Sequence, residues 1–243
     1  MERAVYDRMA ELDADHWWFT ARRQILAEVI RRIVRPPRDA RILEIGAGTG
    51  HNLDMLSAFG TVEGVEFDEH ARDIANARTP HTVKFAALPE LAGIPADHYD
   101  MVALLDVLEH VVDDAGSLAA IFQRLRPGGA LLLAVPANPW MWSAHDVAHH
   151  HQRRYRKREI AALARAAGFH IDLLSPFNTI LFPLIATARI IQKRLARDTA
   201  DDSMPPRPIN AALRRIFSAE TALVGRVPFP FGVSLVAVLR RPA

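Results

Sequence analysis

The stretch Glu44-Ile45-Gly46-Ala47-Gly48-Thr49-Gly50 decides the fold, because it joins an apolar run to a helix through a glycine-rich turn. The run from Ile42 to Ile45 is typical of a buried strand, and apolar residues recur along one side of the segment after the turn. Glycines let the backbone approach a ligand closely, and the N–H groups at the start of a helix face that ligand. The stretch therefore predicts a ligand-binding loop at the end of a strand.

The spacing of the glycines indicates which ligand the loop holds. A dinucleotide-binding loop needs a sixth-position glycine, which here is His51, whereas the shorter pattern GxGxG is complete. Glu44 beside the loop would repel a pyrophosphate but suits an ammonium or sulfonium charge. Glu66 ends the next strand, where a carboxylate can accept hydrogen bonds from ribose hydroxyls, and Phe67 could pack on an adenine face. These residues predict a cationic ligand that carries a ribose.

Strands and helices alternate along most of the chain, which predicts right-handed βαβ units in a mostly parallel, doubly wound sheet. Apolar residues recur at helical spacing between the strands, and Gly168 suits the end of a helix. Besides the first, the expected strands are 61–67, 83–86, 99–105, 130–135 and 232–239.

Composition limits the class of protein. The 243 residues are half hydrophobic and about a quarter charged, which suits one compact domain. The absence of cysteine excludes disulfides, a thiolate nucleophile and cysteine-ligated zinc. A net charge of +2 argues against a nucleic-acid-binding protein. Acids at the start of the chain leave no apolar core for an export signal, so we expect a cytoplasmic protein, with the inner face of the membrane as an alternative site.

Five motifs, in order and correctly spaced between residues 40 and 136, resemble those of the class I S-adenosylmethionine-dependent methyltransferases. They are Glu44–Gly50, Gly64-Val65-Glu66, Tyr99-Asp100-Met101-Val102, Asp106-Val107-Leu108-Glu109-His110-Val111 and Leu125-Arg126-Pro127-Gly128-Gly129. The resemblance implies an enzyme with a Rossmann-like, seven-stranded sheet, helices on both of its faces, and S-adenosylmethionine as cofactor.

The resemblance also implies roles for single residues. The loop glycines would line the methionine part of the cofactor, Glu66 would hold the ribose, and the edge Leu104–Asp106 would flank the cofactor. Family members often have an acid after the third strand to bind adenine, but this chain has Ala86-Ala87-Leu88 there, so apolar contact from Leu88 is expected instead. The predicted cofactor-binding residues are Glu44, Gly46, Ala47, Gly48, Gly50, Glu66, Phe67, Leu88, Asp106 and Arg23.

Arg23 enters this set through the N-terminal aromatic patch His16-Trp17-Trp18-Phe19, which is followed by Arg22 and Arg23. The patch resembles a segment of one bacterial subgroup of these enzymes, in which it would close over the cofactor with an arginine near the methionine carboxylate. The alternative is an amphipathic helix that packs on the domain. We expect a helical lid over residues 1–39 and a methyltransferase domain over 40–243, with insertions at about 138–158 and 173–210.

Methyl transfer is an in-line displacement in which the protein positions the acceptor and can remove a proton from it. The predicted bases are His110 and His149, because histidine titrates near neutral pH. For His110, packing or helix capping is the alternative. The cluster His145, His149, His150 and His151 could instead be a solvated loop, or a metal site completed by Asp146. No metal is assigned to the chain from its sequence.

Two basic segments raise the question of the acceptor. Arg153–Arg158 is strongly basic, and an uncharged stretch, 173–188, precedes a helix with Arg189, Lys193 and Arg197 on one face, backed by Ile190, Ile191 and Leu195. The stretch is too short and too interrupted by proline to span a bilayer, but a basic amphipathic helix can lie among lipid headgroups. Alternatively, this helix covers the sheet or contacts a second subunit.

The expected reaction is methyl transfer to a small or lipid-linked acceptor, with oxygen as the target. The ubiquinone-pathway O-methyltransferases share a motif similar to Asp106–Val111. Alternatives are a tailoring enzyme for a sugar or polyprenyl-linked glycan, an N-methyltransferase of a small metabolite, and a non-catalytic S-adenosylmethionine-binding protein. The intact glycines and Glu66 argue against the last.

Overall fold

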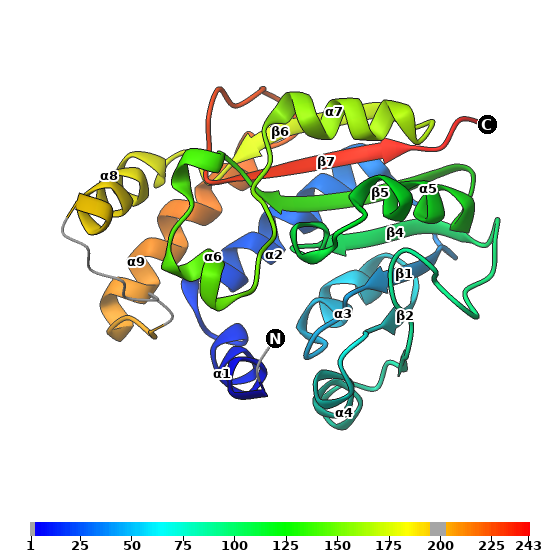
Figure 1. Cartoon of the computed structure of the whole chain (residues 1–243), viewed down its shortest axis with the longest axis horizontal. Helices are drawn as coiled ribbons and strands as arrows, with labels where there is room; N and C mark the ends of the chain where they lie inside the picture. Colours follow the sequence, from blue (N-terminus) through cyan, green and yellow to red (C-terminus); the bar gives the residue numbers. More distant parts are fainter. Residues whose placement is uncertain (1–2, 195–202) are drawn as a thin grey trace.

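The computed structural model describes residues 3–194 and 203–243, and these residues form a seven-stranded sheet in the order β3-β2-β1-β4-β5-β7-β6 (Figure 1). Neighbouring strands from β3 to β5 are parallel, whereas β7 is antiparallel to both β5 and β6. The predicted fold class is confirmed. The strands are β1 (Arg41–Ile45), β2 (Thr61–Val65), β3 (Val83–Lys84), β4 (Tyr99–Leu105), β5 (Leu125–Pro136), β6 (His170–Phe177) and β7 (Ser234–Arg240).

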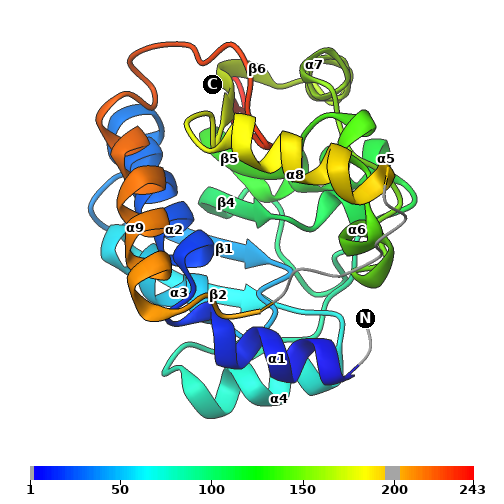
Figure 2. The same ribbon diagram turned by 90° about the vertical axis from the view of Figure 1, so that its left-hand side faces the viewer.

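Helices cover both faces of this sheet (Figure 2). Their bounds are α1 (Arg3–Asp13), α2 (Trp17–Val29), α3 (His51–Leu56), α4 (Glu69–Arg78), α5 (Asp114–Arg124), α6 (Ala144–Ala148), α7 (Lys157–Ala166), α8 (Phe182–Arg194) and α9 (Arg207–Ser218). In the view of Figure 2, α2, α3 and α9 lie on one side of the sheet and α5 and α7 on the other.

The central strand β4 shows why its sequence is almost continuously apolar. Met101, Ala103 and Leu105 face a core that includes residues of α2, α3 and α9, while Val102 and Leu104 face a core built with α5 and α7. Because both faces of the strand are covered, each of these side chains leaves water on folding. The carboxyl end of β4 is thereby held rigidly at the sheet edge, where the candidate site lies.

The N-terminal segment, which the sequence predicts to be helical, contains two helices, α1 and α2. Residues 14–16 are not helical and separate α1 from α2. The side chain of His16 caps α2 by accepting a hydrogen bond from the backbone N–H of Trp18. Trp17 is fixed to α9: its N–H donates to Asn210 Oδ1 at 2.8 Å, and its ring packs edge-on against Phe217. A single turn of π-helix (Ile30–Val34) follows α2 and ends before Pro36.

Strand β6 is the one strand of the sheet that was not among those expected, and it lies where the sequence predicts the start of an insertion. Its edge position leaves several side chains half-buried, so the segment lacks the clear apolar pattern of β4. Part of the uncharged stretch after it forms α8, and α9 begins at Arg207, inside the expected insertion. Leu195, Arg197 and residues 198–202 lie outside the described residues. Within the described ranges, no helix has the length and apolar character needed to cross a bilayer.

Candidate active site

The glycine loop after β1 depends on glycine at particular positions. Gly46, Gly48 and Gly50 all have positive φ, at 72°, 52° and 83°. A Cβ at Gly46 would lie 2.4 Å from Val107 Cγ2, so the loop and the exit of β4 can touch only without a side chain there. A Cβ at Gly48 would meet no described atom within 4 Å. The loop therefore presents bare backbone to open space at Gly48, while Ala47 is buried beneath it.

Glu66 ties this loop to the end of β2. One carboxylate oxygen accepts the N–H of Gly48 and the other accepts the N–H of Asp68, both at 2.9 Å. Burial raises the pKa of Glu66, and these backbone hydrogen bonds oppose that shift. Each oxygen can accept a further hydrogen bond, so the carboxylate can hold the loop and still receive a hydroxyl.

An exposed aromatic pair continues from Glu66. Phe67 is 68% exposed, and its ring centroid lies 6.1 Å from that of Phe85, which is 58% exposed. The Arg72 guanidinium stacks over the Phe85 ring at 5.2 Å. Leu88, in the loop that follows β3, is partly exposed and packs against the core. Phe85 was not predicted, because no motif marks it; only its place after β3 could have indicated it.

Glu44 lies fully buried at the base of the site. One oxygen accepts a hydrogen bond from Asn52 Nδ2 at 2.8 Å, and the other has no hydrogen-bond partner among the described residues. Burial raises the pKa of Glu44 to about 8, although Asn52 and the charge of Arg22 favour the ionised form. The carboxyl group is therefore largely protonated at neutral pH until a cation approaches.

The two adjacent arginines of α2 point to different places. Arg22 is almost completely buried, forms an ion pair with Asp106 at the exit of β4, and stacks on Trp18. Asp106 has a φ of 57°, which turns the backbone sharply at the strand end. Arg23 instead pairs with Asp13. The two arginines are adjacent in the sequence motif, but neighbouring residues of a helix point in different directions, so they reach different partners.

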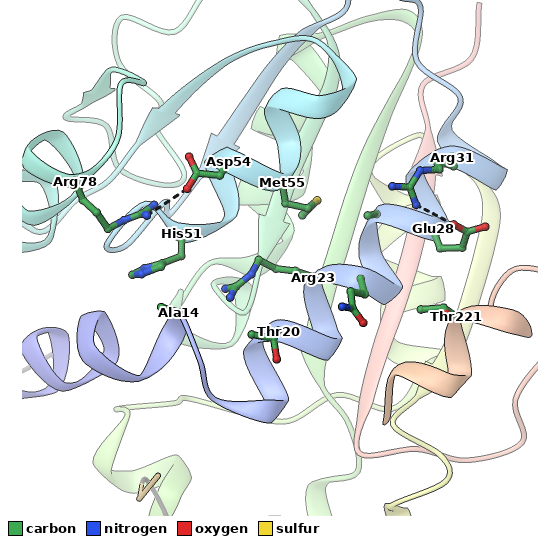
Figure 3. A pocket seen from close by; sticks show the side chains of 12 residues that line it. Ala14, Thr20, Arg23, Glu28, Arg31, His51, Asp54, Met55, Arg78 and Thr221 are labelled. Atoms are coloured by element: carbon green, nitrogen blue, oxygen red, sulfur yellow. Dashed lines mark hydrogen bonds and ion pairs between the residues drawn. The ribbon is translucent and has the colours of Figure 1, made fainter. Parts of the chain in front are cut away.

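Arg23 lines a cavity of about 740 Å³ between α2 and α3 (Figure 3). Its charged side chains are paired: Arg78 with Asp54 at 3.2 Å, and Arg31 with Glu28 at 2.9 Å. Arg78 also donates to the carbonyl oxygens of Thr49 and Gly50, so it supports the glycine loop from behind. Neither Glu66 nor Gly48 is among the residues that line this cavity.

Helix α1 lies against α4 (Figure 2). Asp7 and His70 lie 2.7 Å apart across this contact. Tyr6 is 7% exposed, and its pKa is raised by burial first and then by the negative charges of Glu66 and Asp68. Tyr6 is a residue near the site that carries no signal in the sequence.

The insertion at 138–158 is organised around a buried carboxylate. Asp146 is completely buried and accepts hydrogen bonds from His151 Nδ1 at 2.9 Å, Arg154 Nε at 2.7 Å and the Ser143 N–H at 2.8 Å. These donors hold its pKa well below the usual range despite burial. A solvated loop is therefore the wrong description of this part of the insertion.

The histidines of the insertion meet the end of β4. His110 and His151 pack edge to face with centroids 4.7 Å apart, and the His149 ring lies 6.0 Å from that of His151. Burial, followed by the charges of His151 and His149, lowers the pKa of His110 to about 3. His110 is therefore neutral at physiological pH. Both predicted bases lie in this one cluster, together with the buried side chain of Glu109.

The basic run that follows the histidines is largely neutralised. Arg153 pairs with Asp114 at 2.8 Å, Arg154 is buried against Asp146, and Arg156 pairs with Glu159 at 3.2 Å. Arg154 is therefore withdrawn from any open phosphate-binding or membrane-binding patch, and the charges of Arg153 and Arg156 are partly balanced by their partners. Their partners lie up to 39 residues away, which composition alone cannot show.

A family model described as a methyltransferase domain matches residues 17–174, more than half of the chain. The chain belongs to the methyltransferase domain family. One relative, from Mycolicibacterium smegmatis, carries the name "Probable S-adenosylmethionine-dependent methyltransferase" and is 28% identical over 172 residues, which are 69% of this chain and 65% of the relative. The ubiquinone biosynthesis O-methyltransferase of Aromatoleum aromaticum is 33% identical over 100 residues, 39% of this chain and 43% of that protein. The matches thus span less than two thirds of these relatives.

Solved structures confirm the fold. A methyltransferase in complex with the Haloferax volcanii Trm112 methyltransferase activator has a TM-score of 0.62 at 18% identity, covering 99% of this chain and 95% of that one. The predicted assignment to the S-adenosylmethionine-dependent methyltransferases is confirmed at the level of the family, whose cofactor is S-adenosylmethionine and whose members are enzymes. The subgroup indicated by the HWWF patch stays a prediction.

Proposed function

We propose that this chain transfers a methyl group from S-adenosylmethionine to an oxygen atom of a small or lipid-linked acceptor. The observation that carries the proposal is that three features suited to bind S-adenosylmethionine lie together at one edge of the sheet. The open backbone of Gly48, the buried carboxylate of Glu66 and the Arg22–Asp106 pair all lie at the carboxyl ends of β1, β2 and β4. In open α/β sheets this edge is where ligands bind.

The cofactor would extend along this edge. Its ribose hydroxyls would donate to Glu66, and its adenine would pack between the Phe67–Phe85 pair and Leu88. The methionine part would lie over Gly46–Gly50, where Arg22 is better placed than the predicted Arg23 to meet a carboxylate, because Arg22 reaches Asp106. The amino and sulfonium charges would face Glu44 and Asp106. Helix α1 next to Glu66 supports the proposal that residues 1–39 form a lid over residues 40–243.

The histidine cluster lies where an acceptor would approach the methyl group. Neutral His110 has a free lone pair for a proton from an acceptor hydroxyl, but its lowered pKa makes it a weak base, and His149 is the second candidate base. As the proton leaves, the acceptor oxygen attacks the methyl carbon, the carbon–sulfur bond breaks, and its electron pair remains on sulfur. The reaction needs no covalent enzyme intermediate, which fits a chain without cysteine.

A lipid-linked acceptor is supported by the end of the molecule that carries α8 and α9 (Figure 1). Leu184, Ile190 and Ile191 of α8 are exposed, as are Ile209 and Ile216 of α9. Arg214 and Arg215 are exposed beside the apolar side chains of α9. Apolar side chains next to cations suit contact with an anionic membrane surface. Flotation with anionic vesicles tests this contact: the chain should float at low salt and be released at high salt, and a chain that never floats would contradict it.

Calorimetry tests the cofactor, and mass spectrometry of candidate acceptors tests the reaction. S-adenosylmethionine should bind and NAD should not; the reverse would overturn the assignment. A product gaining a methyl group on oxygen supports the proposal. Methylated nitrogen on a small metabolite would favour an N-methyltransferase instead. Cofactor binding without turnover across phenol, alcohol, sugar and amine acceptors would favour a non-catalytic binding protein.

A further inference from the structure

Three side chains converge where β4 meets the insertion. Glu109 and His110 lie in the 3₁₀ turn Leu108–His110 after β4, and His151 lies near the start of the loop between α6 and α7. One potential ligand atom from each lies within 4.8 Å of the others. The Gln152 N–H donates to the Glu109 carbonyl at 2.7 Å, which fixes the two segments together.

Glu109 is completely buried, and neither of its carboxylate oxygens has a hydrogen-bond partner within the described part of the chain. Burying a carboxylate without hydrogen bonds is costly, so a buried acid is normally paired, protonated or bound to a metal. The nearby cations Arg22 and Arg154 pair with Asp106 and Asp146 instead. The carboxyl group thus lacks a partner that a cation would supply.

Both histidines are oriented by groups behind them. An ionised carboxylate can only accept a hydrogen bond, so the contact of His151 Nδ1 with Asp146 places the proton on Nδ1 and leaves a lone pair on Nε2. His110 is hydrogen-bonded to the backbone of His150. Metal-binding histidines commonly donate their second nitrogen to a carboxylate or a backbone carbonyl, and this fixes the ring.

We propose that Glu109, His110 and His151 bind a divalent transition-metal ion, with zinc or a neighbouring metal as the occupant. Two histidines and one carboxylate form the donor set of catalytic zinc sites and of open iron sites, which keep a position free for water or substrate. The carboxylate supplies a charge to balance the cation. Asp146 would act behind His151 as a positioning residue.

The open position would bind the acceptor oxygen, and this part rests on the proposed function. His110 would then be a metal ligand and not the general base. A bound metal ion lowers the pKa of a coordinated hydroxyl group, so its proton leaves to solvent more easily. The resulting oxygen anion forms the new bond to the methyl carbon while the carbon–sulfur bond breaks toward sulfur. Ion binding itself does not depend on that step.

Cobalt(II) titration of the full chain, freed of metal by a chelator, tests the site. Visible absorption should saturate at one ion per chain, and zinc should displace the cobalt. Glu109→Gln preserves size and removes the charge, and His151→Ala removes a nitrogen ligand. Each should weaken cobalt affinity at least about tenfold. His170→Ala, at a histidine side chain that is 73% exposed, is the matched control and should leave the affinity unchanged.

The inference is overturned if the wild-type chain shows no saturable cobalt absorption. It is also overturned if Glu109→Gln and His110→Ala both bind cobalt as the wild type does, because the neighbouring histidines alone would then explain binding. Thermal unfolding of each metal-free variant shows that it is folded. Calorimetry with S-adenosylmethionine on the metal-free chain separates the two proposals: a Glu109-dependent metal site without cofactor binding would refute the proposed function alone.

Discussion

Two buried glutamates at the same sheet edge have opposite surroundings. Glu66 accepts two backbone N–H groups and anchors the glycine loop, whereas Glu109 accepts none from the described residues. A satisfied carboxylate stabilises the fold and can still receive a ligand hydroxyl. A buried carboxylate without hydrogen bonds destabilises the folded chain while the site is empty, and binding of a cation would remove that energetic cost. The contrast indicates that the cofactor half of the site is preformed and that the acceptor half is completed by what binds there.

The largest effect is expected at the loop that Glu66 anchors. Gly46→Ala places a Cβ against Val107 and forces alanine to a φ of 72°, so the loop must move. We expect cofactor affinity measured by calorimetry to fall by about a hundredfold or more. The left-handed backbone conformation forced on alanine should also lower the free energy of unfolding by about 1–2 kcal/mol.

Gly48→Ala and Gly93→Ala form a matched pair that separates strain from ligand contact. Both glycines have positive φ, and a Cβ at either meets no described atom within 4 Å. Denaturant unfolding should show similar losses of about 1 kcal/mol for the two variants. Only Gly48→Ala should weaken cofactor binding; equal affinities in both variants would contradict the placement of the cofactor over the loop.

Substitution of Asp146 tests whether the contacts within the insertion at 138–158 stabilise the folded chain. Asp146→Asn leaves Arg154 buried beside a neutral amide, so we expect a loss of about 3 kcal/mol in unfolding free energy at pH 7. Because the pKa of Asp146 is depressed in the folded chain, its stabilisation is present above the ordinary carboxyl pKa and is lost as the pH falls below that value. A variant as stable as the wild type at pH 7 would contradict this account.

The same isosteric change should have opposite consequences at the two glutamates. Glu66→Gln places an NH₂ group where backbone N–H donors point and should cost about 1–3 kcal/mol. Glu109→Gln removes an unpaired buried carboxyl group and should leave the metal-free chain equally stable or slightly more stable. Denaturant unfolding of both variants at pH 8 measures the difference. Equal destabilisation would remove the distinction between the two sites.

The last prediction concerns the dependence of stability on pH. The pKa of Glu44 is raised to about 8 in the folded chain, so the folded state holds a proton that the unfolded state releases near the ordinary carboxyl pKa. Stability should therefore decrease as the pH rises from about 5 to 8, and Glu44→Gln should flatten this dependence. A wild-type unfolding profile that is flat over this range would contradict the shift.

The cofactor half of the site was largely predictable because its signals are local. The loop glycines, Glu66 and Phe67 lie within 22 residues, and their spacing reflects one strand, one turn and the next strand. Contacts between distant segments were not predictable. The phase of α2 alone decides that Arg22 rather than Arg23 meets Asp106, and Tyr6 reaches the site only through the packing of α1.

The insertion shows the same limit more strongly. The sequence indicates a cluster of histidines and a cluster of arginines, but not that Asp146 binds one of each or that Glu109 is buried opposite them. Similarly, β6 was missed because an edge strand is only half-buried, so its apolar pattern is weak. The ligand-binding and catalytic roles of all the predicted site residues stay predictions, Leu88, His149 and Arg23 among them.

A crystal structure with S-adenosylhomocysteine bound tests the central claim most directly. The ribose hydroxyls should lie within hydrogen-bond distance of the Glu66 carboxylate, with the amino-acid portion over Gly48 and its carboxylate near Arg22. A nucleoside bound instead in the cavity between α2 and α3, with Glu66 contacting only Gly48 and Asp68, would contradict the account.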